Sequence, residues 1–147
     1  MSRFISIGAS VVILLCIPFF VVTIFSVQGT SMQPTLQDGH RVWICLLPWK
    51  PDVGDIVLLE HPGGNNLIIK RIVGTPLDRI EIAKDFITVG KTKLLLSKDI
   101  SRKLQLYSRV PPGYYVVLGD NPAASEDSRH FGFVGRARIR GRVLGVK

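Results

Sequence analysis

The chain is short of cysteine and of acidic side chains, and each shortage excludes a class of protein. Its 147 residues include two cysteines, too few to staple a chain of this length, so a disulfide scaffold is excluded. Acidic residues number 11 against 19 lysines and arginines, which leaves a formal net charge of +8. Such a balance suggests nucleic acid or an anionic membrane surface as a partner. Internal repeats and low-complexity tracts are absent, and a hydrophobic content of 46% is too high for a disordered chain.

Charged residues are also missing between Arg3 and Asp38. Within this stretch residues 4–27 are nearly all apolar, and roughly 20 such residues suffice for a helix to cross a bilayer. A secretory signal peptide is the competing interpretation, but its apolar region usually has about 7–15 residues, and no Ala-x-Ala cleavage site follows. We therefore predict an uncleaved transmembrane anchor over residues 1–27 and a second domain over residues 28–147. The N-terminus, with its positive charge, is expected to stay cytoplasmic and the second domain to lie across the membrane.

Helical periodicity is absent from the second domain, which consists of short apolar or alternating runs. These runs cover residues 41–47, 55–60, 67–73, 79–83, 86–89, 114–118 and 137–143. Glycine, proline, asparagine and aspartate separate them, as expected for strands joined by turns. The sequence therefore predicts a mainly β domain, a compact coiled antiparallel β-sheet or partly closed barrel, behind one N-terminal transmembrane helix.

Four segments carry side chains that can do chemistry. They read GTSMQPTL at residues 29–36, GDIV at 54–57, IIKRIVG at 68–74 and GDNPAASEDSRHFG at 119–132. Each also has a plain structural interpretation: Ser31 can cap a turn, and the polar side chains of the last segment can hold one loop together. Lys70 is unusual because apolar residues flank it on both sides, although a lysine in such a strand more often reaches a solvated face.

In this order, behind a predicted membrane span, the segments resemble type I signal peptidases, the membrane-anchored serine proteases that use a Ser–Lys dyad. Three motifs carry most of the resemblance: Ser-Met-x-Pro-Thr-Leu, Lys-Arg-Ile-Val-Gly and Gly-Asp-Asn…Ser-x-Asp-Ser-Arg-x-x-Gly. The likeness extends from the anchor to about Gly132. Because 48 residues separate Lys70 from Gly119, the extra β domain of larger members is missing and the chain resembles the minimal forms.

The resemblance implies that Ser31 is the nucleophile and Lys70 the general base. A serine hydroxyl needs a base within hydrogen-bond reach. The pKa of a free lysine is about 10.4, whereas a working base needs one of about 7–8. Burial among apolar neighbours lowers the pKa of a lysine by desolvation, so the apolar flanks of Lys70 also serve the chemistry. We expect no cofactor and no metal ion, and we do not expect His40, His61 or His130 to act as the base.

The last motif is implied to support this dyad. Ser125 matches the serine that hydrogen-bonds and orients the lysine amine. The residues that match the network holding the loop beside the dyad are Asp120, Asp127 and Arg129. The backbone N–H of Ser31 is expected in the oxyanion hole. Some members add a serine hydroxyl where this chain has Gly29, so here backbone or water has to serve.

Members of the family cut after small residues in an Ala-x-Ala pattern, which requires shallow apolar pockets. The candidates to line them are Val27, Met32, Leu36, Ile68 and Ile69, although all are also ordinary core residues. The substrate is expected to lie extended beside the strand before Lys70 and to pair with its backbone. The expected function is therefore the removal of signal peptides from exported preproteins at the membrane surface.

Alternatives remain open on the sequence alone. A specialised processing peptidase of the same scaffold, of the conjugation or pilin type, would use the same dyad on one dedicated substrate. A non-catalytic membrane-anchored β module would not need Ser31 or Lys70. Lysine at position 70 excludes the endoplasmic-reticulum type, which has histidine there. We favour the bacterial plasma membrane, while thylakoid and mitochondrial inner membranes also fit. Leu77 stands where the family commonly has glycine, which alters a turn but touches no catalytic atom.

The positive charge gathers at the end of the chain, where arginine recurs at every second position. The four are Arg136, Arg138, Arg140 and Arg142. A strand there would place them all on one face, which is either solvated or in contact with anionic lipid headgroups. Since the rest of the second domain is close to charge balance, nucleic acid is no longer expected as a partner.

Overall fold

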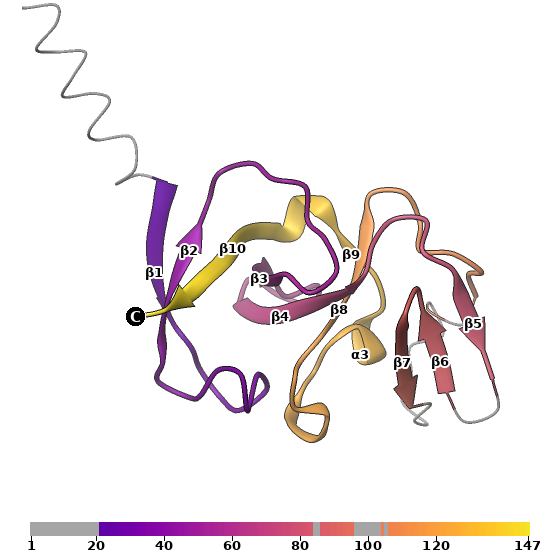
Figure 1. Ribbon diagram of the computed structural model, residues 1–147, viewed down its shortest axis with the longest axis horizontal. Helices are drawn as coiled ribbons and strands as arrows, with labels where there is room; N and C mark the ends of the chain where they lie inside the picture. The colour runs from indigo at the N-terminus through magenta and orange to yellow at the C-terminus, as the bar shows by residue number, and fades with distance from the viewer. Residues whose placement is uncertain (1–20, 84–85, 96–103, 105) are drawn as a thin grey trace, which may run out of the picture.

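The computed structural model describes residues 21–83, 86–95, 104 and 106–147 (Figure 1). Most of the predicted transmembrane segment lies outside these ranges. Within them, no helix combines the length and the apolar character that a membrane crossing requires. The end of the predicted segment is different from expectation, because Val22–Ser26 form strand β1 and pair antiparallel with β2 (Arg41–Cys45). An apolar run that is rich in β-branched and aromatic residues fits a strand as well as a helix, and here its last residues join the sheet.

A curled antiparallel sheet forms the larger part of the domain. After β1 and β2 its strands are β3 (Ile56–Glu60), β4 (Leu67–Gly74), β8 (Tyr114–Leu118), β9 (Val134–Gly135) and β10 (Ile139–Val146). Their order across the sheet is β1-β2-β10-β3-β4-β8-β9. The pairing register shifts twice along β10 and once in β4. Such irregularities bend a strand and increase its twist, which curls the sheet and brings β1 toward β4.

A smaller sheet packs beside the far end of the large one. It consists of β5 (Ile80–Ile82), β6 (Phe86–Val89) and β7 (Thr92–Leu95), in that order. Its buried side chains Ile87 and Val89 share a hydrophobic cluster with Val73 of β4 and Val116 of β8. The two sheets therefore have a common core. A second cluster, which includes Met32 and Ile69, lies under the curled end of the large sheet.

The mainly β prediction is confirmed, and each of the predicted runs contains a strand. These short apolar or alternating runs correctly indicated β2, β3, β4, β5, β6, β8 and β10. The sequence did not indicate β1, β7, the two-residue β9 or the short helix α3 (Ser128–Phe131). β1 lies inside a continuous apolar run, and the two residues of β9 are too few for a periodic pattern to show.

The arginines at the end of the chain do not form one strand face. Arg136 and Arg138 lie in a 3₁₀ helix, η2 (Arg136–Arg138), and only Arg140 and Arg142 belong to β10. The β10 pair faces carboxylates of the same protein, with Arg140 bound to Glu60 and Arg142 Nε 3.1 Å from Asp55 Oδ1. The other two guanidinium groups donate to backbone carbonyls, among them those of Trp49 and His61. The prediction that the four arginines lie on one face of a strand is therefore wrong. Contact of these arginines with lipid headgroups remains a prediction.

Candidate active site

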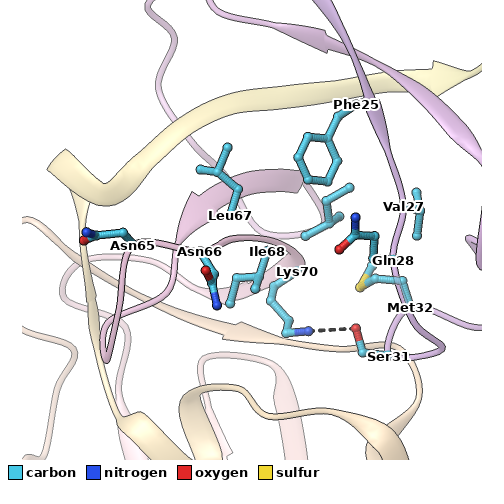
Figure 2. A pocket seen from close by; sticks show the side chains of 11 residues that line it. Phe25, Val27, Gln28, Ser31, Met32, Asn65, Asn66, Leu67, Ile68 and Lys70 are labelled. Carbon is cyan, nitrogen blue, oxygen red and sulfur yellow. Dashed lines mark hydrogen bonds between the residues drawn. The ribbon is translucent and has the colours of Figure 1, made fainter.

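Ser31 and Lys70 are 39 residues apart in the chain and meet at one end of a groove (Figure 2). Lys70 lies in β4, and Ser31 lies in the turn that follows β1. Lys70 Nζ and Ser31 Oγ are hydrogen-bonded at 2.8 Å. This is the distance at which an amine can take a proton from a hydroxyl group.

The amine of Lys70 sits in an apolar environment, and the residue is only 3% exposed. Burial is the largest influence on its pKa and lowers it below the ordinary value for lysine. The carboxylates of Asp127 and Glu126 raise the pKa and the Arg129 guanidinium lowers it, but burial outweighs the carboxylates. A lowered pKa increases the fraction of neutral amine, which is the form that can accept a proton.

The turn that carries Ser31 is anchored in the core on both sides. Gln33 N–H donates to Thr30 O at 3.1 Å, and Leu36 N–H donates to Met32 O at 2.9 Å. Met32 and Leu36 are buried in the cluster under the curled sheet. These contacts fix the backbone on which the Ser31 hydroxyl stands.

The loop with the last motif approaches Ser31 very closely. Asn121 N–H donates to Ser31 O at 3.0 Å, and its side-chain amide donates to Thr30 O at 3.2 Å. At Gly119 a Cβ atom would lie 2.5 Å from Ser31 O and would also collide with Ser125. Only glycine fits between these two groups, so residue 119 allows the first and last motifs to touch.

Asp127 organises this loop from a fully buried position, with no exposed surface. It accepts hydrogen bonds from Gly119 N–H at 3.0 Å, from the Ser125 hydroxyl at 2.7 Å and from Arg129 Nη2 at 2.8 Å. Burial alone would raise the pKa of Asp127, but the hydrogen bonds from Arg129, Gly119 and Ser125 outweigh it, and the pKa is lowered. The carboxylate is thus held ionised.

Ser125 lies in this network with its hydroxyl turned toward Asp127. The structure records no hydrogen bond between Ser125 and Lys70 among the residues it describes, so the orienting contact expected from the family remains a prediction. His130 also supports the loop, since its Nδ1 accepts from Asp127 N–H at 3.3 Å and completes the N-terminal cap of α3.

Asp120 is held by an arginine that the sequence analysis did not select. Arg71, the residue after Lys70, donates through Nε and Nη2 to the two carboxylate oxygens, at 2.8 and 2.7 Å. Burial opposes ionisation of Asp120, but this bidentate pair outweighs it and the pKa is lowered. Arg71 also donates to Gly54 O at 2.9 Å. The second motif, residues 54–57, therefore supports the position of Arg71. The available signal was that Arg71 directly follows Lys70 within one motif of the sequence.

The groove has a volume of about 600 Å³. Beside the dyad it is lined by Phe25, Val27, Gln28, Met32, Asn65, Asn66, Leu67, Ile68 and Ile69. The predicted pocket residues Val27, Met32, Ile68 and Ile69 are among them. Leu36 belongs to the same buried cluster as Met32 but does not line the groove. The sequence analysis missed Phe25, which was assigned to the membrane span, and Asn65 and Asn66, which were taken only as turn residues.

The backbone at Ser31 and Gly29 determines which hydrogen-bond donors are free at the reacting end of the groove. In the part of the chain that the structure describes, the backbone N–H of Ser31 donates no hydrogen bond to a protein group. Gly29 has a φ of +80° and donates its N–H to Asp38 at 2.7 Å. A serine is disfavoured in this backbone conformation.

Across the described residues, no group of three or more His, Cys, Asp or Glu side chains could hold a metal ion.

Comparison with known proteins places these features in a family. The profile of the family described as "Signal peptidase, peptidase S26" matches residues 1–146. The chain is 33% identical over 162 residues to signal peptidase IB of Staphylococcus aureus (strain Mu50), covering 95% of this chain and 84% of the relative. It is 36% identical over 144 residues to signal peptidase I of Bacillus caldolyticus, covering 84% and 78%. A crystal structure of a signal peptidase I from Enterococcus faecalis V583 superposes with a TM-score of 0.51 at 31% identity, covering 66% of this chain and 98% of that one.

Proposed function

The chain belongs to the signal peptidase family, peptidase S26, and is accordingly a serine endopeptidase; we propose that it removes signal peptides from exported preproteins with Ser31 and Lys70. The observation that carries this proposal is the 2.8 Å contact between the Ser31 hydroxyl and the amine of a buried lysine. The nearby carboxylates and arginines pair with one another, which leaves the lysine amine available to the serine.

In the proposed reaction the neutral Lys70 amine takes the proton of the Ser31 hydroxyl as its oxygen attacks the scissile carbonyl carbon. The negative oxygen of the tetrahedral intermediate accepts a hydrogen bond from the backbone N–H of Ser31. The Lys70 ammonium then donates its proton to the leaving amine, the C–N bond breaks, and an ester with Ser31 remains. A water molecule, deprotonated by Lys70, attacks the carbonyl carbon of this ester. The C–O bond to Ser31 then breaks, the Lys70 ammonium returns its proton to Ser31 Oγ, and the signal peptide leaves with a new carboxylate end.

The open edges of the sheet support an extended substrate. β4 pairs with β3 from Leu67 to Arg71, whereas β8 joins its other edge only from Arg71 onward. β1 is the first strand of the sheet and has β2 as its one partner in the described strand order. A peptide laid between these two edges can form backbone hydrogen bonds with both strands. Its side chains would alternate between the groove walls and solvent.

The walls of the groove support cleavage after small residues. Val27, Met32 and Ile69 are buried in the core and present only part of their surface to the groove. Apolar surface of this kind suits small apolar side chains such as that of alanine. We therefore propose an Ala-x-Ala pattern before the scissile bond.

The proposed location is a membrane, with residues 4–20 as a single span. They are almost entirely apolar and run directly into β1, one wall of the groove. The charge at Arg3 places the N-terminus in the cytoplasm and the catalytic domain on the other side of the membrane, which we propose is the bacterial plasma membrane. This arrangement would hold the groove near the bilayer surface, where signal peptides emerge.

Cleavage of an Ala-x-Ala preprotein in detergent tests this function. The full chain, Ser31→Ala and Lys70→Ala are compared, with Gln37→Ala as a control on an exposed residue outside the groove. The proposal expects cleavage by the wild type and the control and none by the dyad variants. Undiminished cleavage by either dyad variant would reject the dyad. Cleavage of one dedicated substrate, but of no general preprotein, would favour a specialised processing peptidase.

A further inference from the structure

The groove continues beyond its apolar part to the turn between β3 and β4. The lining residues at this end are Asn65, Asn66 and Leu67. Figure 2 shows Asn65 at the opposite end of the groove from Ser31. Both asparagine side chains are exposed. The groove therefore has a mainly apolar part near the dyad, which also holds the Gln28 amide, and an amide-lined end far from it.

The turn that carries these amides is held by internal hydrogen bonds centred on His61. His61 N–H donates to Asn66 O at 2.8 Å, and Gly64 N–H donates to His61 O at 3.1 Å. Gly63 N–H donates to His61 Nδ1, also at 3.1 Å. A turn with this many local bonds holds its asparagines in a defined position before a ligand arrives.

The same histidine connects the turn to the loop of the last motif. Its ring packs edge-on against Phe131, with the centroids 5.3 Å apart. Its Nε2 is buried, has no hydrogen-bond partner among the residues that the structure describes, and lies 3.5 Å from a carboxylate oxygen of Glu126. Glu126 stands between Ser125 and Asp127, which belong to the network beside the dyad. The amide-lined end and the reacting end are thus held by one connected structure.

The spacing along β4 determines which part of a substrate can reach the amides. An extended chain advances about 3.3 Å per residue, and Asn66 precedes Lys70 by four positions. Beyond Lys70 the edge of β4 is occupied by β8, so an extended peptide can continue only toward Asn66. The small residues before the scissile bond occupy the apolar part. The residues farther upstream, four to six positions before that bond, then lie over the turn.

We propose that Asn65 and Asn66 are specificity-determining residues that bind the substrate four to six residues before the scissile bond and favour polar groups there. The inference rests on the proposed function, since it assumes an extended peptide beside β4. An asparagine amide both donates and accepts hydrogen bonds, so it can bind peptide backbone or a polar side chain. The preference is for a preprotein whose polar segment lies just before its small cleavage-site residues.

A pair of peptides tests the proposal on the full chain. Both have the same Ala-x-Ala end and the same residues after the scissile bond. The long one extends six residues upstream with serine and asparagine at the fourth to sixth positions, and the short one stops at the third. We expect the wild type to cleave the long peptide with a kcat/KM about tenfold higher, mainly through KM, as the loss of two hydrogen bonds would produce. The double variant Asn65→Ala/Asn66→Ala should cleave both peptides as the wild type cleaves the short one.

The outcomes separate the two proposals. If the double variant keeps the full advantage of the long peptide, or if the wild type shows no such advantage, this inference is overturned. A third peptide with leucine at the fourth to sixth positions tests the chemistry: equal cleavage of the leucine and polar peptides by the wild type would reject the polar preference. Gln37→Ala serves as the matched control and should behave as the wild type. Failure of the wild type to cleave any of the three peptides would instead reject the proposed function.

Discussion

The backbone oxygen of Ser31 lies directly against the α-carbon of Gly119, so that a Cβ at residue 119 would stand 2.5 Å from it. Residues 88 positions apart in the sequence thereby form one packed unit. Asp127 accepts from Gly119 N–H at 3.0 Å, while the neighbouring Asn121 donates to Ser31 O at 3.0 Å. The placement of the Ser31 hydroxyl against Lys70 thus depends on backbone contacts as much as on side chains.

Gly119→Ala is predicted to reduce kcat by about a hundredfold, because a displacement of Ser31 of about 1 Å costs that much when the reacting groups must align. We also expect a loss of about 1–3 kcal/mol in the free energy of unfolding from overpacking. Single-turnover kinetics and urea unfolding measure the two effects. Gly145→Ala is the matched control, since no atom lies within 4 Å of its added Cβ. A Gly119→Ala enzyme with wild-type kcat would show that the close approach is not needed.

Leu77→Gly is predicted to stabilise the protein. Leu77 has a φ of +73°, and its side chain is 58% exposed, so it holds an unfavourable backbone conformation with little burial in return. The strain exceeds the extra chain entropy that glycine loses on folding, and we expect a net gain of about 0.5–1 kcal/mol. Urea unfolding measures this gain in the free energy of unfolding. Leu77→Ala is the control, because alanine at this position keeps the backbone strain of a positive φ. A glycine variant no more stable than the alanine variant would contradict this explanation.

The acid stability of the protein is predicted to depend on Asp127. Its pKa is lowered in the folded state, whereas in the unfolded chain it is about 3.9. The stabilisation from this carboxylate is therefore complete above about pH 4 and is lost as the pH falls through the folded-state pKa. Asp127→Asn should be less stable at neutral pH, and its free energy of unfolding should fall less steeply below about pH 4.

Urea unfolding at a series of pH values measures this difference. Asp52→Asn, at an exposed position, is the control and should follow the wild-type curve. If Asp127→Asn and the wild type lose stability with the same slope in acid, the carboxylate does not contribute as proposed.

Sequence patterns predicted the parts of this structure whose signal is local. Short apolar runs at 67–73 and 114–118 indicated β4 and β8, and the apolar flanks of Lys70 anticipated its burial. In these cases neighbouring residues determine the property, so a single segment is informative. Leu77, which has a positive φ, stood out for another reason, because the family that the chain resembles commonly has glycine there.

Other features depend on contacts between distant segments, and no local pattern could show them. β1 was hidden in a continuous apolar run that also fits a membrane helix. Leu36 and Met32 are both apolar and both buried in one cluster, and only the folded turn determines that Met32 also lines the groove while Leu36 does not. Arg140 and Arg142 face Glu60 and Asp55, carboxylates far away in the sequence, so their charges are paired within the protein.

The dependence of kcat/KM on pH, measured on an Ala-x-Ala peptide with the full chain, tests the dyad most directly. Because burial lowers the pKa of Lys70, activity should rise with pH through an apparent pKa below the ordinary lysine value of about 10.4. Lys70→Arg keeps the positive charge but cannot lose its proton, so it should show no such activity at any pH. A rising limb centred near 10.4, or substantial cleavage by Lys70→Arg, would contradict Lys70 as the base that activates Ser31.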